Sequence, residues 1–391
     1  DRLLLSGASA VASGNTTLQV TNLGGLGGFT TGNGIEVIGT TGGASIQAGA
    51  FALAGGHVDA GAFEYRLNLT GSGGYLSNLA PQPLEAPPPS VDPAVPAAPA
   101  RAPAVGLPLY RAEVPLFAAL PEQLRQGNLA MLGNLHLRRG DDDLKSSSAE
   151  AVDTGERRAW GRVLSTNLDI RQQGTVSPNS HGRLSGFQAG TDLFANTNWR
   201  AGLYVGRLDG DMQVSGFARG IANLGVGSNS LQSEYFGAYG TYTADNGFYA
   251  DAVLQGGRHR YDASPGGSYF ASHGKATSVL ASIEVGQAFA LSENWKIEPQ
   301  LQYAHQRLNM DDVTLSGATV RQDGNSRSML RAGMRLKGQI ATGIGALQPY
   351  VRVNVYRRAG GSDIANFVGP AATTAIATRT GGTSSELAAG A

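Results

Sequence analysis

Apolar and polar residues alternate with a period of two through most of the chain after residue 155. In residues 347–355, for example, the odd positions hold Leu, Pro and Val, whereas the even positions hold Gln, Tyr, Arg and Asn. Residues 279–285 and 330–336 show the same pattern. Successive side chains of a β-strand point to opposite faces, so each run predicts a strand with one apolar and one more polar face.

About ten such runs follow one another, separated by turn residues such as Asn246-Gly247. The runs are 8–14 residues long, which exceeds the usual strand of a soluble sheet and matches a strand that crosses a bilayer. A soluble sandwich would also alternate, but its polar faces would carry many Lys and Glu, whereas these carry Gly, Gln and Ser. The pattern predicts an all-β fold, a transmembrane antiparallel β-barrel, from residues 157–170, 185–195, 199–208, 232–243, 248–255, 279–286, 297–304, 330–337, 347–356 and 383–391.

Aromatic residues near the ends of these runs, such as Trp160, Trp199 and Trp295, fit the girdles that border the apolar band of a membrane barrel. Alternation alone also allows them to be packing residues of a sheet. The polar faces combine acidic and basic residues, which we expect to line the lumen; the alternative for each is a solvated strand face. These lumen-facing candidates are Asp192, Asp251, Glu284, Glu298, Arg331, Arg335, Lys337 and Arg352.

A helix is predicted upstream of the barrel, within residues 112–140. Pro121 suits the first helical position, leucines recur after it at helical spacing, and Gly140 suits the C-terminal cap. Residues 121–139 would extend about 28 Å at 1.5 Å per residue, close to the thickness of a bilayer core. Several polar side chains would be unfavourable against lipid, which favours a helix inside a water-lined lumen over one packed on a soluble sheet. These lumen-helix residues are Glu122, Arg125, Asn128 and Asn134.

The N-terminal part differs in composition from the barrel. Residues 1–79 hold six charged residues among short apolar runs, and glycine pairs separate these runs every 8–12 residues or so. This spacing predicts the last rungs of a parallel β-helix, too few to bury a core alone. Residues 80–111 form a Pro/Ala-rich linker, since nine of the seventeen prolines lie between Pro81 and Pro103.

Composition excludes several classes of function. The 30 basic and 30 acidic residues balance, so nucleic-acid binding is not expected. The chain has no cysteine, which excludes disulfides, thiolate metal sites and a cysteine nucleophile. Its six histidines lack metal-ligand spacing, and neither a GxSxG elbow nor a P-loop is present. We therefore expect no catalytic residues, no cofactor, no metal and no enzymatic activity in this chain.

The order β-helix end, proline-rich linker, helix and barrel resembles the C-terminal part of a pertactin-like autotransporter of type V secretion. Residues 34–38, 49–53 and 58–67 resemble the autochaperone at the end of that family's passenger. Residues 160–162 resemble the opening strand of the family's barrel, and residues 347–354 resemble its ninth strand. The resemblance implies four segments: a passenger end at 1–79, a linker at 80–111, a lumen helix at 112–140 and a barrel at 155–391.

The resemblance also implies a function and a location. The barrel would sit in the bacterial outer membrane and export and anchor its own N-terminal passenger at the cell surface. Implied partners are outer-membrane lipid and lipopolysaccharide, the barrel-assembly machinery, periplasmic chaperones and, through the passenger, a host cell surface; the barrel would be monomeric. Family barrels have twelve strands, so a barrel of about ten is expected to be truncated at its C-terminus. The alternatives are an adhesin acting through the β-helical passenger and a plain outer-membrane pore.

Overall fold

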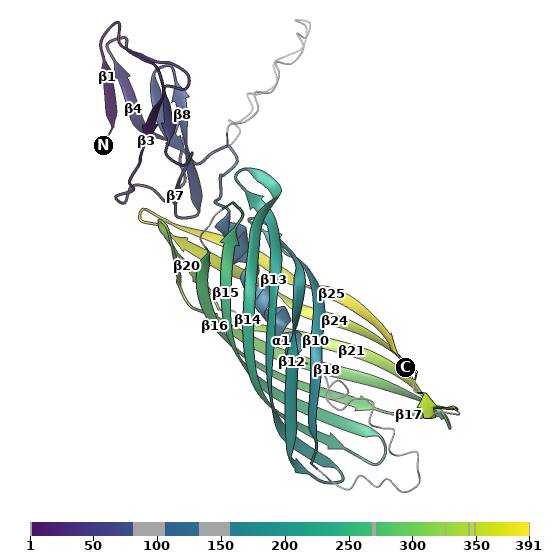
Figure 1. The fold of residues 1–391 in the computed structure, drawn as a ribbon. Helices are drawn as coiled ribbons and strands as arrows, with labels where there is room; N and C mark the ends of the chain where they lie inside the picture. The colour runs from purple at the N-terminus through teal and green to yellow at the C-terminus, as the bar shows by residue number, and fades with distance from the viewer. Residues whose placement is uncertain are drawn as a thin grey trace, which may run out of the picture.

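The computed structural model describes residues 2–80, 106–132, 157–267, 271–324, 326–342, 345–347 and 349–390. A small sheet-rich unit, residues 2–80, lies at one end of a large curved antiparallel sheet, and one helix runs inside the curve of that sheet (Figure 1). We call the end of the large sheet that faces residues 2–80 the mouth. No helix among the described residues has the length and apolar character needed to span a membrane.

Ten strands of at least 13 residues build the large sheet. They are β10 Ala159–Arg171, β12 Asn179–Ala195, β13 Trp199–Ala218, β14 Ile221–Thr243, β15 Phe248–Pro265, β16 Ser272–Gln287, β18 Trp295–Met310, β21 Ser326–Gly338, β24 Tyr350–Val368 and β25 Thr373–Gly390. Four shorter strands also belong to this sheet: β11 Gln173–Gly174, β17 Phe289–Ser292, β19 Val313–Leu315 and β20 Ala318–Gln322. The strands β22 Ile340–Thr342 and β23 Gly345–Leu347 pair with each other in a separate hairpin.

Each long strand pairs antiparallel with the next long strand along the chain, from β10 through to β25. The two outermost strands meet through β11, where Gln173 pairs with Arg379 and Gly174 with Thr378. Farther from the mouth, a cavity of about 640 Å³ separates β10 from β25; Leu164, Arg352 and Glu386 are among its lining. The sheet is thus joined into a barrel at the mouth, and a side opening lies below the join.

The long strands extend farther toward the mouth than the alternation predicts. β14 begins at Ile221, whereas the predicted run starts at residue 232, and β25 begins at Thr373 instead of residue 383. Near the mouth, outward positions of β14 such as Ser228 and Ser230 are polar, whereas inward positions such as Leu231, and Ile376 of β25, are apolar and buried. The apolar-outward alternation therefore ends there, although the ladder of backbone hydrogen bonds continues.

The helix α1 spans Glu113–Leu132. The expected start at Pro121 is wrong, because Pro121 lies inside the helix, eight residues after its first residue. Residues 133–140, the rest of the predicted helix, lie outside the described residues, as does the linker from residue 81 to residue 105.

Residues 2–80 combine parallel and antiparallel pairing. Three pairs are parallel: β1 (Leu3–Ser6) with β4 (Ile35–Thr41), β2 (Val11–Ala12) with β5 (Ser45–Ile46), and β3 (Thr16–Leu18) with β6 (Phe51–Leu53). These pairs stack two turns of chain. The strands β7 (Val58–Ala60), β8 (Phe63–Thr70) and β9 (Gly73–Ser77) then continue the sheet antiparallel. A parallel β-helix proper stays a prediction.

Candidate functional site

The alternation along each barrel strand separates a lumen face from an outer face. In β15, Asp251 and Gln255 are buried inside the barrel, whereas Leu254 is 57% exposed on the outside. Val279 on β16 and Phe236 on β14 are exposed on the same outer face. An apolar outer face suits contact with lipid, and a polar inner face suits a solvated or plugged lumen.

The helix α1 fills the mouth half of the lumen. Its first turns are almost wholly apolar and buried, and the Phe117 ring meets the Phe367 ring of β24 edge-on at 6.2 Å. The same core contains Val176, Val214 and Leu308 from three separate segments of the wall. Because the helix packs against strands on several sides of the barrel, it acts as a plug.

A buried ion-pair cluster holds the middle of the helix. The Arg125 guanidinium donates two hydrogen bonds of 2.7 Å to the Asp363 carboxylate of β24. Arg327 of β21 donates a third at 3.1 Å, and Glu122 lies 3.6 Å from Arg125. Two basic and two acidic side chains thus balance. Such a cluster is stable only while every member keeps its partners, since unpaired buried charge is costly.

Pro121 leaves one helix carbonyl without its usual hydrogen-bond donor, and a side chain of the barrel wall replaces that donor. Proline has no N–H, so the Phe117 carbonyl, four residues earlier, cannot accept its usual helical hydrogen bond. The Gln322 side chain of β20 donates to that carbonyl at 2.8 Å. One residue before it, the Leu116 carbonyl accepts from Asn229 of β14 at 3.0 Å. The helix therefore tolerates an internal proline because wall side chains satisfy its backbone.

Asn128 anchors the lower part of the helix. Its side-chain amide donates to Gln306 at 3.0 Å and accepts from the Ser278 hydroxyl at 3.1 Å. The Asn128 backbone carbonyl accepts from Gln255 at 3.1 Å. These three partners lie on β18, β16 and β15, so one residue of the plug ties three adjacent strands.

Most of the predicted lumen residues are buried, and the contacts that the structure describes for them are mainly with other residues of the barrel wall. Arg331 lies at the centre of one cluster, with Glu284 at 2.7 Å and Gln300, Gln302 and Asn354 at 2.9–3.0 Å. Other contacts are Asp192 with Arg200, Asp251 with Thr241, Glu298 with Gln300, Arg335 over the Tyr350 ring, and Arg352 with Glu386. Lys337 is half-buried.

That these residues solvate the helix stays a prediction. Among the described contacts, the Arg125 guanidinium binds the Asp363 carboxylate, which Arg327 also binds, and Glu122 accepts a hydrogen bond from Gln126 of the helix itself. Asp363 was missed because it lies outside the predicted runs. Asn134, the remaining lumen-helix candidate, lies outside the described residues.

At the mouth, a short extended segment connects residues 2–80 with the barrel. The Glu64 N–H donates to the Leu109 carbonyl, and the Arg219 N–H, from the turn between β13 and β14, donates to the Tyr110 carbonyl. A row of rings follows the same path, with centroid separations of 5.5–6.0 Å, through Phe29, Phe63, Tyr110 and Phe217. Backbone and aromatic contacts together seat residues 2–80 on the mouth.

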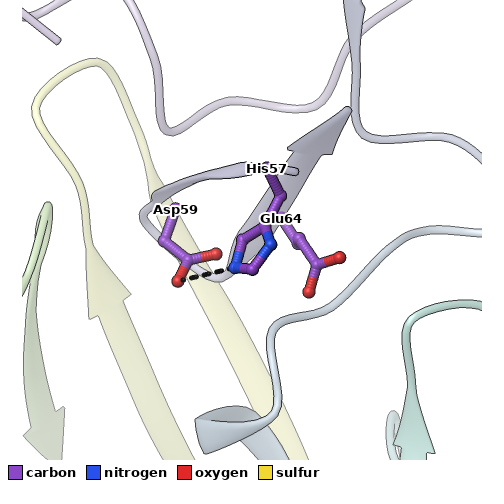
Figure 2. A group of neighbouring side chains, drawn as sticks. All are labelled: His57, Asp59 and Glu64. Carbon is purple, nitrogen blue, oxygen red and sulfur yellow. Dashed lines mark ion pairs between the residues drawn. The ribbon is translucent and has the colours of Figure 1, made fainter. Parts of the chain in front are cut away.

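Charged side chains surround this junction. His57, Asp59 and Glu64 point toward one another, and their possible ligand atoms lie within 4.8 Å (Figure 2). Both Glu64 oxygens are already occupied, one by Arg66 at 2.7 Å and the other by Arg219 at 2.8 Å. Three guanidinium groups thus crowd the cluster once Arg111, 3.6 Å from Asp59, is included. This concentration of positive charge disfavours the binding of a metal ion. The cluster joins residues 2–80 to the barrel.

The same environment shifts two pKa values. The Asp59 carboxylate raises the pKa of the neighbouring His57, and the partial burial of His57 offsets this rise only in part. Burial alone would raise the pKa of Asp59, but His57 and the Arg111 charge outweigh it, so the pKa lies below its usual value. The pair is therefore most stable when His57 is protonated and Asp59 is ionised.

Two glycines allow close approach at the junction. Gly61 donates its N–H to the Gly317 carbonyl at 2.9 Å, joining residues 2–80 to the β19–β20 turn. Gly317 has a φ of +71°, and a Cβ there would lie 2.6 Å from the Asp59 carbonyl oxygen. Only glycine combines this backbone conformation with so little room.

Comparisons with known proteins describe both parts of the chain. One family model, the autotransporter beta-domain, matches residues 159–391, and another, autochaperone domain type 1, matches residues 1–67. The pertactin autotransporter of Bordetella bronchiseptica is 31% identical over 242 residues, covering 59% of this chain and 25% of its own length. The adhesin BmaC autotransporter of Brucella suis is 29% identical over 338 residues, covering 80% of this chain and 9% of its own.

Solved structures of similar fold include the beta domain of the Bordetella autotransporter BrkA. It is 22% identical, with a TM-score of 0.42 over 58% of this chain and 98% of that one. The transport unit of AIDA-I from Escherichia coli is 15% identical, with a TM-score of 0.45 over 70% and 98%. The chain spans about a quarter of the length of the pertactin relative. Since the beta-domain model matches more than half of its residues, the chain belongs to the autotransporter family and carries that family's translocator barrel after an autochaperone domain.

Proposed function

We propose that the barrel exports an N-terminal passenger and anchors it at the bacterial surface, with residues 2–80 outside the cell. Autotransporter beta-domains are outer-membrane β-barrels, which gives the barrel its location. The observation that carries the proposal is the path of the chain: α1 begins at the mouth beside residues 2–80 and runs down inside the lumen (Figure 1). A segment that precedes the barrel in sequence lies beyond its mouth, and the connection lies within the pore.

Under this proposal the helix has two successive roles. During export, the lumen holds a passing extended chain, whose backbone groups the polar wall can solvate. Afterwards, α1 stays in place, with Arg125, Asn128 and the Phe117 carbonyl bound by the wall. The bound helix closes the mouth half and anchors whatever precedes it.

Residues 2–80 would act as the first folded unit outside. β1 pairs in parallel with β4 along one edge, and its other edge can receive a preceding turn of chain in the same way. Sequential addition of turns would then draw folding outward from the mouth. We propose no enzymatic activity for this portion.

The proposed partners follow from this cycle. They are the barrel-assembly machinery and periplasmic chaperones before insertion, and outer-membrane lipid, including lipopolysaccharide, around a monomeric barrel afterwards. A surface-adhesive role through the passenger is the second candidate, supported by similarity to an autotransporter named as an adhesin. A plain pore is disfavoured because a buried helix occupies its lumen.

The test uses the complete gene in intact cells. One epitope tag is placed before Asp1, and a control tag in the turn at Asn246-Gly247, at the end of the barrel away from the mouth. External protease should remove the first tag and spare the second. Protection of both tags until the outer membrane is broken, with the barrel inserted, would place residues 2–80 in the periplasm and refute the proposal.

A further inference from the structure

On β13 to β16, the outer face of the barrel changes from apolar to polar between one cross-strand row and the next. One cross-strand row of outward residues is apolar or small: Val205, Phe236, Gly256 and Val279 on β13 to β16. The next outward row toward the mouth is Arg207, Glu234, Arg258 and Thr277, and the row after it is Asp209, Gln232, Arg260 and Lys275. The apolar row marks the edge of the lipid-facing band, so the two polar rows lie at headgroup level.

Two like charges face each other in the second polar row. Arg260 and Lys275 are direct partners in the β15–β16 ladder, and both are exposed. Like charges directly opposite one another in an antiparallel pair destabilise it. Neither forms an ion pair with the residues that the structure describes, nor does Arg258 in the row below. Three cations thus adjoin the lipid band without a bound carboxylate.

The patch is also hollowed. A cavity of about 400 Å³ opens on this face, lined by Arg207, Glu234, Arg258, Arg260, Lys275 and Asp311. Arg207 is already paired with Asp209 at 2.7 Å. Glu234 and Asp311 reduce the positive charge, but the three remaining basic side chains, Arg258, Arg260 and Lys275, still outnumber these two acidic ones. An anion seated there would relieve the repulsion between Arg260 and Lys275.

We infer that this hollow binds a phosphate group of the outer-leaflet glycolipid, the lipid A part of lipopolysaccharide. Arginine and lysine at the headgroup level of a membrane protein recognise lipid phosphates. The position supports a lipid source, since the acyl chains would lie against Val205, Phe236 and Val279 directly below. The inference rests on the proposed function, because this lipid faces the hollow only when the mouth points outward.

The experiment compares lipid retention by the purified full chain. The protein is exchanged into detergent with bisphosphorylated lipid A or with lipid A lacking both phosphates, and retained lipid is counted by native mass spectrometry. The test variant is Arg260→Gln with Lys275→Gln. The matched control, Arg183→Gln with Arg357→Gln, removes two exposed outward arginines from β12 and β24. Heat-modifiable gel mobility confirms that each barrel is folded.

We expect the original chain and the control to retain bisphosphorylated lipid A at least ten-fold better than the test variant. Equal retention by the test variant, equal loss in the control, or indifference to the phosphates would overturn the inference. Displacement of the lipid by millimolar inorganic phosphate would overturn the lipid source and leave a general anion site. The tag experiment measures the orientation of the barrel separately. A mouth that faces the periplasm and a hollow that does not bind lipid A would therefore give different results.

Discussion

Arg125 on the plug helix and Asp363 on β24 are 238 positions apart in the sequence, and two hydrogen bonds of 2.7 Å join them inside the barrel. Both side chains are 2% exposed. This pair fixes the helix to the strand that precedes β25, at the level where Pro121 has weakened the helix's own hydrogen bonding. The position of the helix in the lumen thus depends on a few residues of the barrel wall.

Removing the Asp363 charge should loosen the plug. Asp363→Asn leaves Arg125 and Arg327 buried without their carboxylate, which costs about 3–5 kcal/mol for a broken buried pair. We expect a lower thermal midpoint and larger, noisier conductance in planar bilayers. The control is Asp312→Asn at an exposed pair of similar distance with Arg321, where the change should stay below about 1 kcal/mol. Unchanged conductance in Asp363→Asn would show that the pair does not hold the helix.

Gln322 should matter because of Pro121. Gln322→Leu leaves the Phe117 carbonyl buried and unbonded, at a cost of about 1–3 kcal/mol. Pro121→Ala restores an N–H at the helix position that bonds this carbonyl, so Gln322→Leu should cost less in that background. Unfolding midpoints of the four chains in a double-mutant cycle measure the coupling. Additive effects would mean that Gln322 acts by some route other than the proline.

The junction at the mouth should weaken as pH rises. The pKa of His57 is raised by Asp59, so its stabilising contribution is complete below the ordinary pKa of 6.5 and is lost as pH rises through the higher folded value. Glu64, Arg219 and Arg111 also face this group. Hydrogen exchange of the β8 amides, corrected for intrinsic rates, should show more protection at pH 6 than at pH 8.

His57→Gln should flatten that pH dependence while leaving the barrel intact. The lowered pKa of Asp59 contributes in a different range, since its stabilisation is present above its ordinary pKa and is lost only as pH falls through the lower folded value. If the pH dependence persists in His57→Gln, a group other than His57 causes it.

Gly317 should be intolerant of a side chain. Gly317→Ala places a Cβ 2.6 Å from the Asp59 carbonyl oxygen and adds strain at a φ of +71°. We expect residues 2–80 to separate from the mouth, seen as faster protease cleavage near residue 106. The control is Gly267→Ala, where φ is +81° but nothing lies within 4 Å of the added Cβ. Gly267→Ala introduces the backbone strain without a clash, at a cost of about 1 kcal/mol. Equal cleavage in both variants would therefore show that backbone strain, and not the contact with Asp59, causes the effect.

Alternation determined the barrel from the sequence. Val351, Val353 and Val355 must face one side of a strand and Asn354 the other, whatever the rest of the chain does. A pattern with period two is a local property, and lipid and lumen impose it on every strand. The ten long strands, the antiparallel sheet and a single helix that carries polar side chains among the described residues follow from such local information.

The sequence was less informative where the strands extend beyond the apolar band, and where a residue far along the chain compensates for a local rule. The start of β14 was missed because the apolar-outward alternation does not extend through residues 221–231, where Leu231 faces inward and Ser230 outward. Pro121 marks a helix start by local rules, yet it lies inside α1, because Gln322, some 200 residues away, supplies the missing hydrogen bond.

Tertiary structure alone decided which polar residues touch the plug. Alternation places Arg331 and Glu284 in the lumen, but it cannot say that they pair with each other while Asp363 takes Arg125. Likewise, no local signal places Glu64 beside Arg219, 155 positions later. Strand pattern depends on each residue and its neighbours, whereas these partners depend on register, strand tilt and the depth of the helix, which only the assembled barrel fixes.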